Sequence, residues 1–148
     1  MKLNGTKVAS IIKDICKARI DVLKKFYKIP KLAIIQVGEN SASNIYVKNK
    51  IKDCIEVGIE SNLYVFEDVR GDIHQMARIR HLIQELNCDK SVDGIMCQLP
   101  MEGVDPRYQR RILDLIADEK DVDGLCSDIF TTINVPFSGD RFIPCTPH

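Results

Sequence analysis

The sequence predicts an α/β fold in three layers, with an open, mostly parallel sheet and helices on both of its faces. Short apolar runs typical of buried strands alternate along the chain with longer segments of helical periodicity. A helix between two successive strands is the usual crossover of a parallel sheet, because each crossover must cover one sheet face. With 148 residues, the chain is long enough to bury its own core. We therefore expect one domain over residues 1–148.

The first part of the chain predicts a helix, a strand and a second helix. Apolar residues at helical spacing begin near Thr6 and stop before Pro30, which indicates an amphipathic helix. Residues 31–37 form a nearly continuous apolar run, as expected of a parallel strand buried on both faces. The short polar side chains that follow suit a helix start, and Gly58 fits the left-handed position that closes many helices. The second helix should therefore end at about residue 57.

The same alternation continues towards the C-terminus. Residues 59–66 predict a second strand, and apolar residues at helical spacing over 73–86 predict the next helix. A third apolar run at 92–98 predicts a strand that the following Leu-Pro ends. Pro106 suits the first turn of a further helix, and the chain after Asp121 is expected to be rich in loops.

Composition and spacing exclude several classes of function. Lys plus Arg and Asp plus Glu both total 21, so no global positive field exists to bind nucleic acid. The chain contains no apolar run of about 18 residues, which predicts no membrane span and a cytoplasmic protein. No Gly-x-Gly-x-x-Gly motif is present to bind a dinucleotide. The six cysteines form no Cys-x-x-Cys pair, so we expect reduced thiols and no metal site.

Candidate site residues follow from where ligands bind in parallel sheets. That place is a crevice at the carboxyl ends of the strands, where neighbouring crossovers leave in opposite directions. If the first and third strands are neighbours, Tyr46 and Lys50 on the second helix should face Gln98. A lysine beside the core loses hydration, which disfavours its ammonium form and makes the amine a candidate proton acceptor. An amide at Gln98 can orient that amine.

Each candidate also has a simpler interpretation. Most lysines on helices are solvated, and Gln98 can be a strand-end residue that caps a loop. Asp121, Asp123 and Gly124 suit an ordinary acidic turn, and they offer too few oxygens for calcium. The residues alone leave these interpretations open.

Four ordered motifs resemble the bifunctional methylenetetrahydrofolate dehydrogenase/cyclohydrolase family. They are Tyr46-Val47-Lys48-Asn49-Lys50, residues 92–100 ending in Gln-Leu-Pro, residues 120–124 and Pro144-Cys145-Thr146-Pro147. The resemblance is to the N-terminal catalytic domain and covers nearly the whole chain. It implies an enzyme of one-carbon metabolism that oxidises 5,10-methylenetetrahydrofolate with NADP and hydrolyses the methenyl product to 10-formyltetrahydrofolate.

The resemblance also implies a role for each matched residue. Lys50 would transfer a proton in the hydrolytic step, and Gln98 would tune it. Tyr46 would stack on the aminobenzoyl ring, and Asp123 would accept hydrogen bonds from the pterin. The remaining pocket residues would be Ser43, Leu99 and Pro100.

Members of this family bind NADP or NAD on a C-terminal Rossmann domain, which the sequence does not contain. We expect the full-length parent to be a homodimer, and this chain to bind tetrahydrofolate derivatives without performing hydride transfer. Two alternatives remain. One is a non-catalytic folate-binding or regulatory module, and the other is an assembly or interaction domain with no small-molecule role. If helices of the parent normally cover part of the sheet, their absence should leave an apolar patch that favours self-association.

Overall fold

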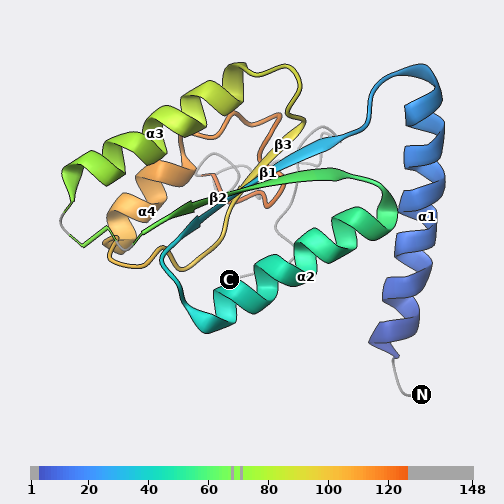
Figure 1. The fold of residues 1–148 in the computed structure, drawn as a ribbon, viewed down its shortest axis with the longest axis horizontal. Helices are drawn as coiled ribbons and strands as arrows, with labels where there is room; N and C mark the ends of the chain where they lie inside the picture. The colour runs from blue at the N-terminus through green and yellow to red at the C-terminus, as the bar shows by residue number, and fades with distance from the viewer. Residues whose placement is uncertain (1–3, 68, 71, 127–148) are drawn as a thin grey trace, which may run out of the picture.

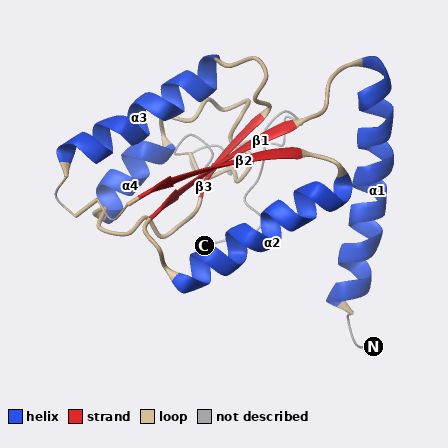
Figure 2. Cartoon of the chain, viewed as in Figure 1, coloured by secondary structure: helices blue, strands red, loops and turns tan. Residues whose placement is uncertain are grey.

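The computed structural model describes residues 4–67, 69–70 and 72–126. Helices and strands alternate as the sequence predicts, although the third strand is shorter than residues 92–98 (Figure 2). The elements are α1 (Gly5–Phe26), β1 (Lys31–Val37), α2 (Ser41–Val57), β2 (Glu60–Phe66), α3 (Ile73–Cys88), β3 (Gly94–Cys97) and α4 (Pro106–Leu113).

The three strands form a parallel sheet in the order β2-β1-β3. Successive residues of β1 point to opposite faces of this sheet. Ala33, Ile35 and Val37 enter the main core beside α3 and α4, whereas Ile34 packs with Val47 of α2. Figure 1 shows the same layers, with α2 on one side of the strands and α3 and α4 on the other. The predicted three-layer α/β fold is confirmed, and burial on both faces explains why β1 is a nearly continuous apolar run.

Local side chains set the ends of the helices. The side chain of Asn40 accepts from the N–H groups of Ala42 and Ser43 at the start of α2. Gly58 ends that helix with a φ of +89°, in the left-handed conformation expected from the sequence. Asp105 caps α4 in the same way as Asn40 caps α2, directly before Pro106.

A short segment after α4 extends the sheet beside β3. Ile95 pairs in parallel with Asp121, and its N–H donates to the carbonyl of Lys120 over 2.7 Å. A Cβ at Gly94 would lie only 2.6 Å from Val122 Cγ1, so glycine permits this close approach. The buried ammonium of Lys120 donates to the carbonyls of Leu86 (2.8 Å) and Asp89 (2.7 Å) at the end of α3. Lys120 therefore ties this segment to the helix layer.

The first helix is amphipathic, as the sequence predicts, but most of its apolar face is not buried. It lies against α2, and Lys13 forms ion pairs with Asp53 and Glu56. Ile20 is its one buried residue, while its apolar stripe is exposed. The stripe consists of Val8, Ile11, Ile12, Ile15, Val22, Leu23 and Phe26. Helical periodicity identifies an apolar face, but it does not identify what covers that face.

Among the described residues, no helix combines the length and apolar character needed to cross a membrane.

The first prediction concerns Lys120. A Lys120→Met substitution keeps most of the side-chain stem but removes the donors to Leu86 and Asp89. Two carbonyls at the end of α3 then lose a charged donor, although that of Asp89 still accepts from the N–H of Val92 over 3.1 Å. The free energy of unfolding should therefore fall by about 1–3 kcal/mol. Urea denaturation measures this change. Lys52→Met, at an exposed position of α2, is the control and should leave the midpoint nearly unchanged. Equal midpoints for the two variants would contradict the structural role of Lys120.

Candidate active site

The sheet topology creates one position where neighbouring crossovers diverge. From β1 the chain passes through α2 to β2 on one side, and from β3 it passes through α4 to residues 120–121 on the other. The two connecting helices lie on opposite faces of the sheet (Figure 1). The carboxyl ends of β1 and β3 therefore bound the place where parallel α/β sheets bind ligands.

Lys50 and Gln98 meet at this position, as the sequence analysis expected. Lys50 Nζ donates to Gln98 Oε1 over 3.3 Å, and both residues are half-buried. The amide nitrogen of Gln98 donates to the carbonyl of Leu99 over 2.7 Å. That second bond fixes the amide so that its oxygen, which can only accept, faces the lysine. The geometry joins an amine from a crossover helix to an amide at a strand end.

Asp123 is the third charged or polar group at this site. Loss of hydration raises the pKa of its carboxyl above the ordinary 3.8; the Lys50 ammonium opposes this shift, and the Asp121 charge adds to it. Burial raises the pKa of the Cys97 thiol, at the last residue of β3, and the charges of Asp123 and Asp121 raise it further. These interactions place the Asp123 carboxylate near both Lys50 and the end of β3.

The two carboxylates of this segment have different surroundings. The buried side chain of Asp121 accepts from the N–H groups of Gly124 (3.0 Å) and Cys126 (2.9 Å). Asp121 therefore builds a turn, which favours the turn interpretation of residues 121–124 over a cation loop. Across the described residues, no cluster of three or more His, Cys, Asp and Glu side chains is arranged to hold a metal ion.

The other predicted residues occupy distinct places around Lys50 and Gln98. Tyr46 lies one turn before Lys50 on α2, and its side chain is 62% exposed. Ser43 is buried on the same helix, two turns before Lys50. Leu99 packs against the main core, and Pro100 is exposed after a cis peptide bond. Their roles towards a substrate remain predictions.

The thiol at the end of β3 is not a nucleophile. Burial, followed by the charges of Asp123 and Asp121, raises the pKa of Cys97 to about 12. The thiol therefore stays protonated near neutral pH and behaves as a small apolar group. Cys16, Cys54, Cys88 and Cys126 are also free thiols. The Pro144–Pro147 motif lies outside the described residues.

Gln36, Asn44 and Glu102, which the sequence analysis did not single out, hold the loop beside the site through hydrogen bonds. Gln36, buried within β1, donates to the carbonyl of Gly38 over 3.0 Å and to Asn44 Oδ1. Glu102 accepts from the N–H of Glu39 over 2.8 Å. Together these bonds fix the loop between β1 and α2, and hence the start of the helix that carries Lys50. The available signal was the glutamine itself, a polar residue inside an otherwise apolar strand.

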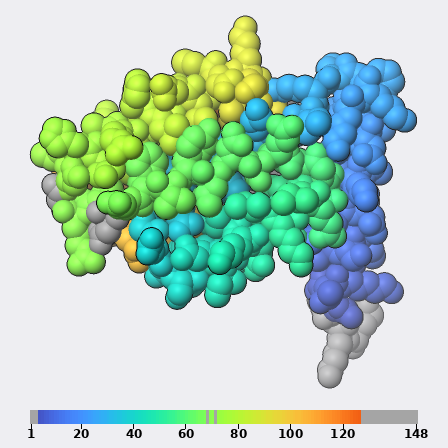
Figure 3. Space-filling model, in the orientation of Figure 1, coloured from blue at the N-terminus to red at the C-terminus, as the bar shows by residue number. Residues whose placement is uncertain are grey.

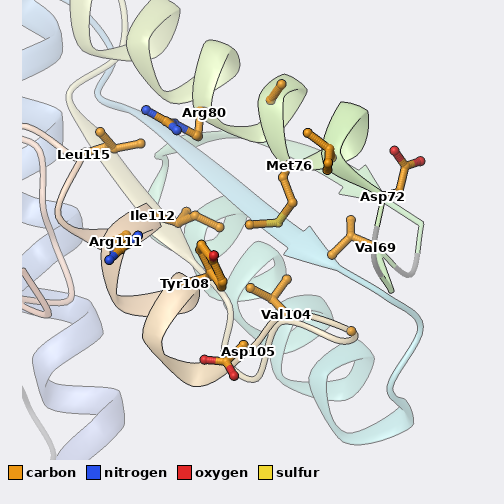
Figure 4. Close-up of a pocket in the computed structure, with 13 residues that line it drawn as sticks. Val69, Asp72, Met76, Arg80, Val104, Asp105, Tyr108, Arg111, Ile112 and Leu115 are labelled. Carbon is orange, nitrogen blue, oxygen red and sulfur yellow. The ribbon is translucent and has the colours of Figure 1, made fainter.

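A pocket of about 820 Å³ lies elsewhere, between α3 and α4 (Figure 4). Met76, Val104 and Ile112 line it with apolar atoms, and Arg80 and Arg111 are also among its lining residues. None of the predicted site residues lines this pocket. It also opens on the α3 and α4 side of the sheet, away from α2. We therefore identify the candidate site by its topology and polar groups rather than by the size of a hollow.

An open parallel sheet with polar groups gathered at its crossover point defines the class of α/β ligand-binding domains. Within that class, residues 3–123 match the family model described as "Tetrahydrofolate dehydrogenase/cyclohydrolase, catalytic domain". The chain belongs to this family.

Relatives and solved structures agree with the family assignment. The chain is 40% identical over 151 residues to "Bifunctional protein FolD" of Geobacillus thermodenitrificans, covering 99% of this chain and 49% of that protein. The bifunctional FolD dehydrogenase/cyclohydrolase of Campylobacter jejuni superposes with a TM-score of 0.82 and 35% identity, over 94% of this chain and 47% of that one. An NAD-dependent 5,10-methylenetetrahydrofolate dehydrogenase from Saccharomyces cerevisiae superposes with a TM-score of 0.80 and 25% identity, over 95% of this chain and 44% of that one. The chain spans about half the length of these relatives.

The second prediction concerns the cost of ionising Asp123. Its pKa is raised in the folded state, so folding favours the protonated carboxyl. Relative to a variant with no charge at this position, the native protein should therefore lose stability as pH rises. The loss begins near the ordinary pKa of 3.8 and is complete above the raised pKa of the folded state, after which the difference in stability between the two proteins stays constant. We expect Asp123→Asn to be more stable than the native chain at pH 7, with a smaller difference at pH 3. Urea midpoints at the two pH values measure this. Exposed Glu119→Gln is the control, and a native chain that is the more stable of the two at pH 7 would refute the prediction.

Proposed function

We propose that this chain supplies the folate site of a methylenetetrahydrofolate dehydrogenase/cyclohydrolase and carries the hydrolytic step of that enzyme. The observation that supports this most directly is the contact between Lys50 Nζ and Gln98 Oε1, in a chain of this family, at the point where the crossovers diverge. The partners would be tetrahydrofolate derivatives. The full-length protein would be a cytoplasmic homodimer.

In the proposed hydrolysis, water adds to the methenyl carbon of 5,10-methenyltetrahydrofolate. A carbon–oxygen bond forms, and Lys50 Nζ would accept a proton from the attacking water. One carbon–nitrogen bond of the bridge then breaks, and its electron pair stays on the pterin ring nitrogen, which gains a proton. The carbon becomes a formyl group on the other nitrogen, and one proton is released overall. Gln98 would hold the amine in position through its carbonyl oxygen.

Two residues would orient the substrate. The exposed ring of Tyr46 offers a flat apolar surface one helical turn from Lys50, suited to stacking on the aminobenzoyl group. Asp123 would accept hydrogen bonds from the amino and ring N–H groups of the pterin, because an ionised carboxylate is an acceptor only. Its desolvated position makes such donors especially favourable. Ser43, Leu99 and Pro100 would line the remainder of the pocket.

The dehydrogenase step needs NADP or NAD, and the described residues do not fit a nucleotide. In nucleotide-binding folds, the loop after the first strand presents N–H groups to the phosphates. Here the carboxylate of Glu102 lies against Gly38 and accepts from the N–H of Glu39, while Asn40 caps α2. The Glu102 carboxylate and the Asn40 side chain thus occupy the N–H groups that a phosphate would need in this loop. We therefore assign hydride transfer to a nucleotide held by another part of the full-length protein.

The third prediction tests the hydrolytic role of Lys50. We expect the purified chain to accelerate hydrolysis of 5,10-methenyltetrahydrofolate, followed by its absorbance. Lys50→Met should lower the rate by about a hundredfold or more, because a positioned proton acceptor contributes on that order. Lys48→Met is the matched control, since this exposed lysine on the same helix lies off the shared face of Tyr46 and Lys50.

The outcome also separates the alternatives. Folate binding, seen as a rise in melting temperature, without any turnover would favour a binding or regulatory module. The absence of any folate-dependent rise would favour an assembly domain. Equal loss of rate in the Lys48 and Lys50 variants would exclude Lys50 as the proton acceptor.

The fourth prediction concerns Tyr46. Tyr46→Ala should weaken binding of the folate by about 0.5–1.5 kcal/mol, up to roughly tenfold in Kd, because it removes the stacking surface. Tyr46→Phe keeps the ring and should bind like the native chain. Calorimetric titration measures both affinities. A comparable loss in both variants would indicate that the hydroxyl, and not the ring, makes the contact.

A further inference from the structure

The outer edge of β2 carries backbone groups directed away from the sheet. In a strand, the N–H and C=O of one residue point to the same side, and successive residues alternate. The N–H of Glu60 and the C=O of Phe66 both bond towards β1. It follows that Ser61, Leu63 and Val65 direct their backbone groups outward. In the space-filling view, the green residues of β2 form a band on the surface between α2 and α3 (Figure 3).

Apolar side chains accompany these outward groups. On the α2 face of the edge, Leu63 is 41% exposed and Val65 is 58% exposed. Ile55 lies on the flank of α2 away from Lys50 and is 72% exposed. Glu60 is the single charged residue of β2. A long edge strand with exposed apolar residues and few charges is a template for pairing with another strand.

We propose that β2 pairs in antiparallel orientation with β2 of a second copy of this chain, about a two-fold axis at Leu63. Leu63 then lies opposite Leu63 of the second copy, and Ser61 lies opposite Val65 on each side. All of these residues direct their backbone groups outward, so the pairs exchange about six hydrogen bonds. The two sheets become one continuous sheet. A formal net charge of zero means that no overall repulsion opposes the approach of two copies.

The same register brings opposite charges together on the other face. Residues 60, 62, 64 and 66 point towards the α3 side, where their partners in β1 enter the main core. Glu60 of the second copy lies opposite Phe66, and Arg78 of α3 lies over that ring at 5.9 Å. A hollow of about 370 Å³ beside Phe66 is lined in part by Arg78, His81 and Glu85. Glu85 Oε1 lies 3.4 Å from His81 Nε2, so Arg78 is the cation in this hollow to which we assign the incoming carboxylate. The edge is thus complementary to itself in backbone and apolar groups. Arg78 adds a cation on the side of Glu60 of the second copy, which also lies 3.7 Å from Lys31 of its own chain.

The exposed stripe of α1 is the rival surface for self-association. It is apolar over much of the helix, but it contains no directional groups that specify a partner. A variant on α1 therefore serves as the discriminating control.

The fifth prediction is tested by light scattering of the full 148-residue chain after gel filtration, over a range of concentrations. We expect a mass of twice 16.8 kDa for the native chain. Leu63→Lys and Leu63→Glu should each give the monomer mass, because each places like charges opposite one another at the axis. An equimolar mixture of these two variants should form a heterodimer. That rescue requires residue 63 to face itself.

Two further variants complete the test, and circular dichroism melting confirms that each variant is folded. Ile15→Lys on α1 should leave the dimer intact. Arg78→Glu should weaken it, and adding Glu60→Arg to that chain should restore it. The proposal is overturned by a monomeric native chain, by a dimer that survives Leu63→Lys, by a mixture that stays monomeric, or by a dimer lost in Ile15→Lys.

Discussion

The rest of the site depends on the divergence of two crossovers at β1 and β3. Because α2 covers one sheet face and α4 the other, the strand ends between them are not covered by a connecting helix. Packing of Val47 on Ile34 and Met96 sets the height of α2 above the sheet. Lys50, one turn beyond Val47, then reaches Gln98 at the end of β3. A hydrogen bond between residues 48 positions apart is thus a consequence of apolar packing and chain topology.

The neighbouring carboxylates Asp121 and Asp123 have different surroundings within one turn. Asp121 receives two backbone N–H groups, which satisfy its charge inside the protein. Desolvation of the Asp123 carboxyl outweighs its attraction to Lys50, so ionisation of this group costs free energy in the folded chain. A ligand that offers hydrogen-bond donors repays that cost on binding. If Asp123 binds the pterin as proposed, the desolvation that lowers the stability of the native chain would also increase the benefit of a matching substrate, which is the usual conflict between stability and function.

The sequence predicts most of this fold because its signals are local. The apolar run of β1, the cap at Asn40 and the left-handed Gly58 each depend on residues that are close together in the chain. Lys50 and Gln98 could be brought together in advance because the topology rule supplies the long-range information. Gln36 with Asn44 and Glu102 with Glu39 were not foreseen, since a polar side chain does not reveal which distant group will satisfy it. Lys120 is a similar case, a lysine that is buried because two carbonyls of α3 surround its ammonium.

The exposed stripe of α1 and the outer edge of β2 differ in the chemical groups that a partner must supply. The stripe on α1 requires only that water be excluded, and many apolar faces can meet that requirement. The edge of β2 requires donors and acceptors at the spacing of a strand, which few partners other than a strand supply. Backbone pairing also restricts the register, because a shift of one residue would place the outward groups of Leu63 opposite a residue whose own groups bond towards β1. The chain spans about half of its relatives, so apolar area alone does not define an interface here. The directional groups of β2 do define one, because they determine the partner's secondary structure, its orientation and the residue at the axis.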